Sequence, residues 1–317
     1  MQSSLTSDEK QVKKKLKGVS YGKWGLIFLI PFFVAYIIFT LIPQFLTIYY
    51  SFFEYFKGPL FDYVGPNFVG LDNYIELFTP VNDTIYILKY AWNTFLIWII
   101  GAIPQLIISL LLAVIFTSTR LNIKFQGFFK SVFYMPNVIM ASAFALLFFQ
   151  VFGDVGPVNS MLDQMGLKTF RFLDYEIPIK SLIALMNYLM WFGNTTILLM
   201  AGIQSIDESV FESARMDGAG SLRVFKDITM PLLKPIFIYV VITSMIGGIQ
   251  MYDVPQILTS GNGNPNETTM TIVMYLNRVL NPSRNYGMGG AVSVVLFLIT
   301  GILSLFVFKT MAKGEED

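Results

Sequence analysis

The side chains able to do chemistry in this chain are mainly amides, carboxylates and aromatic rings, because the 317 residues include neither histidine nor cysteine. Histidine is the commonest acid–base group at neutral pH, and thiolates are common ligands of zinc. We therefore expect no catalytic residue and no metal site. The groups that stand out lie in or beside apolar runs, and they are Asn137, Trp191, Asn194, Gln250, Tyr252 and Asp253.

These six residues are candidates for ligand binding. A polar group at membrane depth is costly unless it faces a protein interior or a water-filled cavity. Amides donate and accept hydrogen bonds side by side, and aromatic rings offer flat apolar faces, so the set suits a neutral polyol better than a cation. The alternative for each residue is a structural role, in an interhelical hydrogen bond or in the aromatic belt at a membrane interface.

The elements that must position these groups are membrane spans. Hydrophobic residues make up 54% of the chain, the mean hydropathy is +0.59, and charged residues reach only 14%, against roughly 25% in ordinary soluble domains. A bilayer core needs about 20 mostly apolar helical residues. Six stretches qualify, which predicts an all-α integral membrane protein with spans at 24–50, 93–117, 129–152, 181–203, 236–255 and 290–311.

Basic residues predict how these spans are oriented. Of the 22 Lys and Arg residues, fifteen fall in the N-terminal segment, the C-terminal tail and the two loops on the same side, and seven fall in the opposite loops. Basic residues in short loops tend to stay cytoplasmic, so we expect both termini to face the cytoplasm. The net charge of only +1 argues against a nucleic-acid partner.

The expected organisation has three parts: a basic cytoplasmic segment (1–23), a transmembrane domain (24–311) and a cytoplasmic tail (312–317). The N-terminal lysines followed by apolar sequence resemble a secretory signal. That apolar run is too long and lacks a small-residue cleavage site, so we interpret it as a retained anchor.

The most informative segment is the cytoplasmic loop from 204 to 235. Ser205 and Glu208 have the spacing of a capping box, and Ile206, Val210, Phe211 and Ala214 then share one helical face. Asp217-Gly218 predicts the helix end, because Gly favours the left-handed backbone found there. A second short helix is predicted to follow Gly220 and to end before Pro231. Acidic residues offset the basic ones, so a protein partner is favoured over the lipid surface.

This loop resembles the EAA loop of permeases from binding-protein-dependent ABC importers. The resemblance is carried by Glu212 to Gly220, which read Glu-Ser-Ala-Arg-Met-Asp-Gly-Ala-Gly, and then by Phe225, Ile228, Pro231 and Pro235. One departure is Ser213, which stands where the family usually has Ala. The resemblance implies that the loop docks on an ATPase and that coupling depends on Glu212, Ser213, Ala214, Asp217, Gly218 and Ala219.

The resemblance also implies partners. These are a second homologous permease, two ATPase subunits or a dimer that bind the ATP and Mg, an extracytoplasmic solute-binding protein, and the bilayer of a bacterial or archaeal cytoplasmic membrane. No cofactor is expected in this chain. Its only Gly-Lys pair, Gly22-Lys23, precedes Trp24 and lacks the upstream Gly of a phosphate-binding loop.

Further matches point to the sugar-permease branch, the family of the large subunit of maltose-type importers. They include 68–74 after the first span and Met135-Pro136 in the third. The large external insert of some relatives and two N-terminal spans are missing. By this resemblance, Asn137, Trp191, Asn194 and Gln250 lie near sugar-lining positions, although most residue identities differ. The resemblance assigns binding-protein docking to Gly261, Asn262, Gly263, Asn264 and Pro265, for which the alternative is a plain flexible turn.

Two other classes remain as alternatives. A secondary transporter or channel subunit without an ATPase would show ionisable residues deep in its spans, or inverted repeats, and only Asp253 comes close. A membrane enzyme would need converging acid–base groups, whereas the acidic residues here lie scattered in loops.

Overall fold

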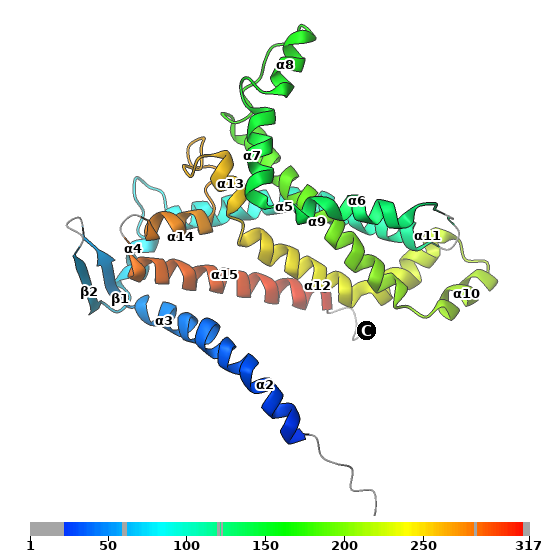
Figure 1. The fold of residues 1–317 in the computed structure, drawn as a ribbon, viewed down its shortest axis with the longest axis horizontal. Helices are drawn as coiled ribbons and strands as arrows, with labels where there is room; N and C mark the ends of the chain where they lie inside the picture. Colours follow the sequence, from blue (N-terminus) through cyan, green and yellow to red (C-terminus); the bar gives the residue numbers. More distant parts are fainter. Residues whose placement is uncertain (1–21, 59–61, 119–120, 122, 282–283, 313–317) are drawn as a thin grey trace, which may run out of the picture. The chain divides into compact units, whose positions relative to one another are not determined.

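The computed structural model describes residues 22–58, 62–118, 121, 123–281 and 284–312, and it is almost wholly helical there (Figure 1). The chain divides into two compact units, residues 1–49 and residues 50–317. Most of the predicted N-terminal segment (1–23) and of the predicted tail (312–317) lies outside the described residues.

The first unit is one helical run. It consists of α2 (Gly22–Tyr36), the π-helical turn η1 (Ile37–Leu41) and α3 (Ile42–Tyr50), whose last residue belongs to the second unit. The predicted span at 24–50 is confirmed as a candidate membrane helix, Trp24–Tyr50. The π-turn ends two residues before Pro43. A proline ring crowds the carbonyl four residues earlier, and a wider turn at that point relieves the crowding.

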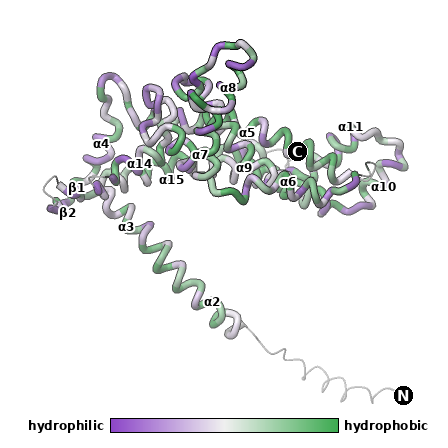
Figure 2. The backbone as a smooth tube through the Cα atoms, turned by 45° about the horizontal axis from the view of Figure 1, so that its top comes forward, coloured by the Kyte–Doolittle hydropathy of each residue, from purple (hydrophilic) through white to green (hydrophobic). Residues whose placement is uncertain are grey.

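The second unit contributes the other five candidate spans, so the predicted number of six is confirmed for the described residues. Three of these helices extend a few residues beyond the predicted spans 93–117, 181–203 and 290–311. They are α5 (Tyr86–Thr117), α9 (Glu176–Gln204) and α15 (Tyr286–Ala312). Hydrophilic residues gather at the loops and short elements, while the long helices are mainly apolar (Figure 2).

The predicted third span, 129–152, is wrong as a single helix. The chain forms α6 (Gln126–Val138) and α7 (Ala141–Phe152), with extended backbone at Ile139 and Met140 between them. The two helices run in different directions (Figure 1). Pro136 removes a backbone donor in the last turn of α6, which weakens the helix there. The third candidate span combines α7 with α8 (Pro157–Gln164) instead.

The predicted fifth span, 236–255, is also interrupted. A continuous run of α11 (Ser221–Val224), η2 (Phe225–Thr229) and α12 (Met230–Ile249) is followed by non-helical residues 250–252 and by α13 (Asp253–Leu258). The predicted helix end before Pro231 is therefore wrong. The π-turn η2 ends two residues before Pro231, as η1 does before Pro43, so the helix passes the proline without breaking.

Several short elements lie at two opposite ends of the second unit (Figure 1). At one end lies α10 (Glu208–Met216), and we call it the α10 end. At the other lie the antiparallel strands β1 (Phe53–Lys57) and β2 (Tyr63–Phe68), with α4 (Asp72–Phe78) and α14 (Ile272–Leu280). We call this the α14 end.

Close backbone contacts hold the helices together. A side chain at Gly101 of α5 would overlap the backbone of Ala184 in α9, and one at Gly193 of α9 would overlap the carbonyl of Phe133 in α6. Small residues allow such approach between membrane helices, where the hydrophobic effect adds little to association. Glycines in these spans therefore fix helix positions.

We predict that Gly193→Ala destabilises the protein by about 1–3 kcal/mol, because the new methyl group must displace α6. Gly301→Ala in α15 is the control, since a Cβ there meets open space, and it should be neutral or stabilising by up to about 1 kcal/mol. Thermal unfolding of the purified protein in detergent measures both. Equal midpoints for the two variants would contradict the proposed packing.

Candidate functional site

The two interrupted spans come together in space. The half-helices α7 and α13, each following a break, pack against one another and against α9. Asn137 precedes one break, and Gln250, Tyr252 and Asp253 form or follow the other. Non-helical backbone at membrane depth is tolerated only where protein covers it or where it lines a cavity. The breaks thus mark the region in which an internal path is expected.

Hydrogen bonds from neighbouring elements stabilise both breaks. The Asn137 amide donates to the carbonyl of Met190 in α9 at 3.1 Å. The Thr271 hydroxyl donates to the carbonyl of Met251 at 3.0 Å. Tyr252 and Asn277 are also hydrogen-bonded to each other. Gln250 and Asp253 are exposed. Asn137 and Tyr252 therefore form hydrogen bonds within the protein, which is the structural role that the sequence analysis gave as the alternative for these residues.

A cavity of about 170 Å³ lies beside the second break, between α5, α9 and α12. Two of the predicted residues, Trp191 and Asn194, line it, and the Trp191 side chain is 47% exposed. None of the lining residues, all in the described part of the chain, is charged. The polar and aromatic ones are Trp98, Gln105, Asn187, Trp191, Asn194, Thr195, Tyr239, Thr243 and Ser244.

Trp98 forms a wall of this cavity and rests on a glycine. A side chain at Gly248 of α12 would overlap the Trp98 ring, so only Gly allows the ring to lie there. The indole nitrogen donates to the Ser244 hydroxyl at 3.4 Å. Two indole rings and three amides thus surround an uncharged space, which can stack on apolar faces and pair with hydroxyl groups.

Sequence reasoning missed Trp98, Gln105 and Asn187. The signal was present for the two amides, because Gln105 and Asn187 are polar residues inside apolar runs. Gln105 also donates to the Thr195 hydroxyl at 2.9 Å in the core. Trp98 gave no such signal, since only its contact with α12 distinguishes it from the other aromatic residues of the spans.

The α10 end carries the predicted coupling residues. Asp207, and not Ser205, caps α10: its carboxylate accepts from the Ser209 amide at 2.9 Å. This bond holds the pKa of Asp207 below its usual value. Ser205 instead follows α9 and donates to the Gly202 carbonyl, so the predicted capping box is wrong. The predicted stop is confirmed, because Gly218 has φ +75° and the Ala219 amide donates to the Ala214 carbonyl at 2.9 Å.

The outer face of α10 is open. Glu212, Ser213, Asp217 and Gly218 are exposed, Ala219 is half-buried, and Ala214 is buried. Val210, predicted on the buried face, is also exposed. A cavity of about 370 Å³ separates α10 from the ends of α5 and α9. The helix is therefore attached to the bundle without dense packing.

Two large apolar residues at this end of the unit are also open, Met216 at the end of α10 with 88% exposed and Leu222 in α11 with 80% exposed.

The predicted docking residues 261–265 belong to an ordered loop, residues 259–271, at the α14 end. Gly261 and Gly263 have left-handed backbone. The Gly263 amide donates to the Thr259 hydroxyl, and the Thr269 hydroxyl donates to the Asn264 carbonyl. Internal bonds of this kind fix the loop, which is more than the plain flexible turn considered as the alternative.

Comparison with known proteins decides the family. Residues 90–312 match the family described as binding-protein-dependent transport system inner membrane component. The chain belongs to this family. Both breaks, the cavity, α10 and the 259–271 loop lie inside the matched region, whereas the first unit, β1, β2 and α4 lie outside it.

Two relatives extend the similarity to most of this permease chain. The arabinooligosaccharides transport system permease protein AraP of Bacillus subtilis is 31% identical over 91% of the chain and 89% of its own length. The probable ABC transporter permease protein YesP of the same organism is 30% identical over 90% of the chain and 89% of its own length. The chain is thus a multi-pass membrane component of a transport system.

A solved structure shares the fold. A chain from the crystal structure of a bacterial alginate ABC transporter, in complex with alginate pentasaccharide-bound periplasmic protein, aligns with a TM-score of 0.76. It is 18% identical, and the alignment covers 96% of this chain and 99% of that one.

We predict that Asp207→Ala speeds hydrogen exchange at the Ser209 amide, because the first turn of α10 loses its cap. Ser205→Ala is the matched control, since its hydroxyl bonds only to α9. Exchange followed by mass spectrometry over residues 207–216 measures both. Faster exchange in the Ser205→Ala variant alone would show that Ser205 caps α10, as the capping-box prediction held.

Proposed function

We propose that this permease forms half of the translocation path for a neutral sugar or oligosaccharide, with a second permease as the other half. The observation that supports this most directly is the uncharged cavity between α5, α9 and α12, in which Trp98 and Trp191 accompany three amides. It lies next to a broken helix, and such breaks are typical of transport sites.

Named relatives support the choice of solute class. AraP carries arabinooligosaccharides in its name, and the neighbouring crystal structure holds an alginate pentasaccharide on its periplasmic protein. Alginate is described there as acidic. An acidic ligand would need nearby cations, and none of the lining residues of the present cavity, within the described chain, is a cation.

The partners in this proposal follow from the two ends of the second unit. The exposed face of α10, together with Met216 and Leu222, would dock on an ATPase that binds ATP and Mg. The residues of this chain that would couple the two proteins are Glu212, Ser213, Ala214, Asp217, Gly218 and Ala219. The α10 end would then be cytoplasmic, which agrees with the excess of Lys and Arg on that side. An extracytoplasmic solute-binding protein would dock at residues 261–265.

The first test is co-purification of the chain with the products of neighbouring genes. The chain should co-purify with a second permease and an ATPase in stoichiometric amounts, and the solute-binding protein should bind neutral oligosaccharides in a ligand screen. A lone chain that transports without an ATPase would contradict the proposal and favour a secondary transporter.

We predict that Gly248→Ala lowers oligosaccharide uptake at least several-fold, because the new methyl group pushes Trp98 out of its place. Gly247→Ala is the control: this neighbouring glycine also lines the cavity, yet its Cβ meets no atom within 4 Å. Uptake of the labelled oligosaccharide into whole cells, at equal protein level, measures both. Equal uptake by the two variants would show that the Trp98 wall is not part of the solute site.

We predict that Glu212→Lys and Gly218→Val uncouple ATP hydrolysis from uptake. The first reverses a charge on the docking face, and the second forbids the left-handed backbone at φ +75°. Asp227→Lys is the control, since Asp227 lies at the same end, in an exposed pair with Arg223. ATPase activity and uptake are measured together in proteoliposomes. Normal uptake in both test variants would defeat the assigned coupling role.

A further inference from the structure

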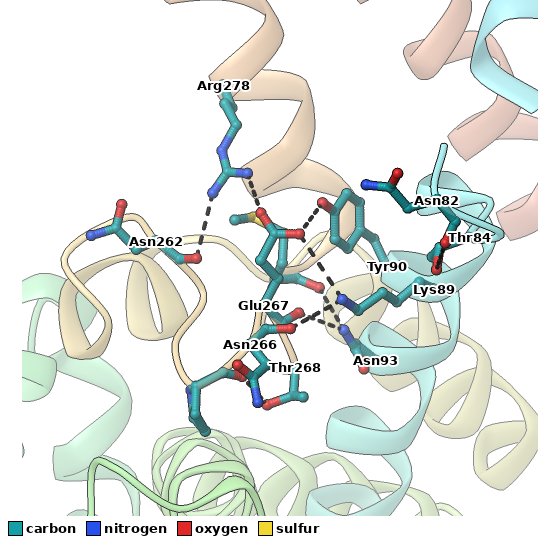
Figure 3. Close-up of polar contacts among 12 residues, drawn as sticks. Asn82, Thr84, Lys89, Tyr90, Asn93, Asn262, Asn266, Glu267, Thr268 and Arg278 are labelled. Atoms are coloured by element: carbon teal, nitrogen blue, oxygen red, sulfur yellow. Dashed lines mark hydrogen bonds and ion pairs between the residues drawn. The ribbon is translucent and has the colours of Figure 1, made fainter. Parts of the chain in front are cut away.

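Glu267 is the centre of a polar cluster at the α14 end, which includes Tyr90 and Lys89 from α5 and Arg278 from α14 (Figure 3). The Tyr90 hydroxyl donates to one carboxylate oxygen of Glu267 at 2.7 Å, and Arg278 Nη1 donates to the other at 2.6 Å. Lys89 Nζ lies 4.0 Å from the first oxygen. The carboxylate thus joins two helices that are far apart in the sequence.

The cluster reaches the predicted docking residues through Arg278. Its Nη2 donates to the carbonyl of Asn262 at 3.4 Å while Nη1 holds Glu267. Charge-assisted bonds of this type, made by the rigid guanidinium fork, fix position as well as adding energy. The docking segment is therefore tied to α5 by a continuous path, from Asn262 through Arg278 and Glu267 to Tyr90.

The backbone beside Glu267 is anchored to the same helix. Lys89 Nζ donates to the Asn266 carbonyl at 3.0 Å, and the buried Asn93 amide donates to the Glu267 carbonyl at 3.0 Å. Asn266 and Glu267 both have left-handed backbone, at φ +50° and +57°. A conformation this uncommon for a glutamate persists only where the surroundings impose it.

The carboxylate is ionised at neutral pH. Partial burial opposes ionisation of Glu267, but the hydrogen bonds from Arg278 and Tyr90 and the charges of Arg278 and Lys89 outweigh it and hold its pKa below the usual value. A carboxyl whose pKa is lowered on folding stabilises the fold above its unfolded pKa, and this contribution is lost as the pH falls through the lowered value. The ion pairs are therefore complete under ordinary conditions.

We propose that Glu267 is a positioning residue that fixes the 259–271 loop on the outer end of α5, so that the loop is a preformed docking element for the solute-binding protein. This inference rests on the proposed function. A loop held in its bound shape loses less conformational freedom on association, and so it binds more tightly than a loop that must first become ordered. The role of Glu267 is indirect, since it acts through Arg278 and the backbone of residues 262–267.

The test is the binding-protein dependence of ATPase activity in proteoliposomes that contain the assembled transporter. Glu267→Gln keeps the shape of the side chain but loses its charge. It should raise the half-saturating concentration of sugar-loaded binding protein about tenfold, which corresponds to about 1.4 kcal/mol, and should leave the saturating rate unchanged. Asp83→Asn is the matched control, because Asp83 is also acidic and left-handed, is exposed where Glu267 is half-buried, and is not among the residues given above as partners of the Glu267 carboxylate.

A milder variant keeps the test decisive if Glu267→Gln fails to assemble. Tyr90→Phe removes one hydroxyl from the carboxylate, and it should shift the half-saturating concentration in the same direction by a smaller factor. An unchanged half-saturating concentration in the assembled variants, or a fall in the saturating rate alone, would overturn the proposal.

Hydrogen exchange separates failure of this inference from failure of the proposed function. In the purified chain, Glu267→Gln should speed exchange of the amides in residues 259–271 and leave those of 97–110 in α5 unchanged. This result does not depend on any partner. If exchange of the loop is unchanged, Glu267 does not hold it. If the wild-type complex is not stimulated by binding protein, the proposed function fails instead.

Discussion

The packing of α5 against α9 is the interaction on which the other features depend. Gly101 lets the two backbones approach at Ala184, and farther along, Ser109 donates to the Phe192 carbonyl at 2.8 Å. Between membrane helices, close approach and buried hydrogen bonds replace the hydrophobic driving force. The same two helices carry the cavity walls, and their ends border the space under α10. The 259–271 loop rests on the start of α5. One interface thus sets the relative positions of all three sites.

Satisfaction of the backbone explains where the chain departs from long helices. Each break exposes amides and carbonyls that lipid cannot satisfy. The break after α12 is stabilised by Thr271, and the end of α6 is held by Asn137 through Met190. Polar residues near the breaks therefore stabilise the structure. The cavity beside the breaks is lined by other amides as well as by Trp191 and Asn194.

Much of this architecture could be predicted from the sequence, because length and hydropathy define membrane helices strongly. The first span matched in full, and Asp217-Gly218 placed the end of α10 correctly. The first break could not be predicted, since the apolar sequence continues through Ile139 and Met140 and their conformation is set by neighbouring helices. The second break falls at residues 250–252, inside the predicted span 236–255, where Gln250 and Tyr252 were interpreted as polar groups within a continuous helix. The cap was misassigned because Ser205 and Asp207 both have suitable spacing, and only the end of α9 decides between them.

The site was predicted in part for a related reason. Polarity in an apolar run identified Trp191's neighbour Asn194, but it does not say which way a side chain faces. Trp98 became a candidate only through Gly248, which lies 150 residues later in the chain. Such contacts are set by tertiary packing, which a single sequence does not show.

The absence of charge among the described residues that line the cavity has an energetic consequence. Moving one elementary charge across a potential of 100 mV involves about 2.3 kcal/mol, which is how ion-driven carriers obtain their work. In the proposed function, the solute between Trp98 and Trp191 is neutral, and the described residues around it contribute no charge. The electrical gradient of the membrane would then do no work on it at this point, and the work of accumulation would come from the proposed ATPase.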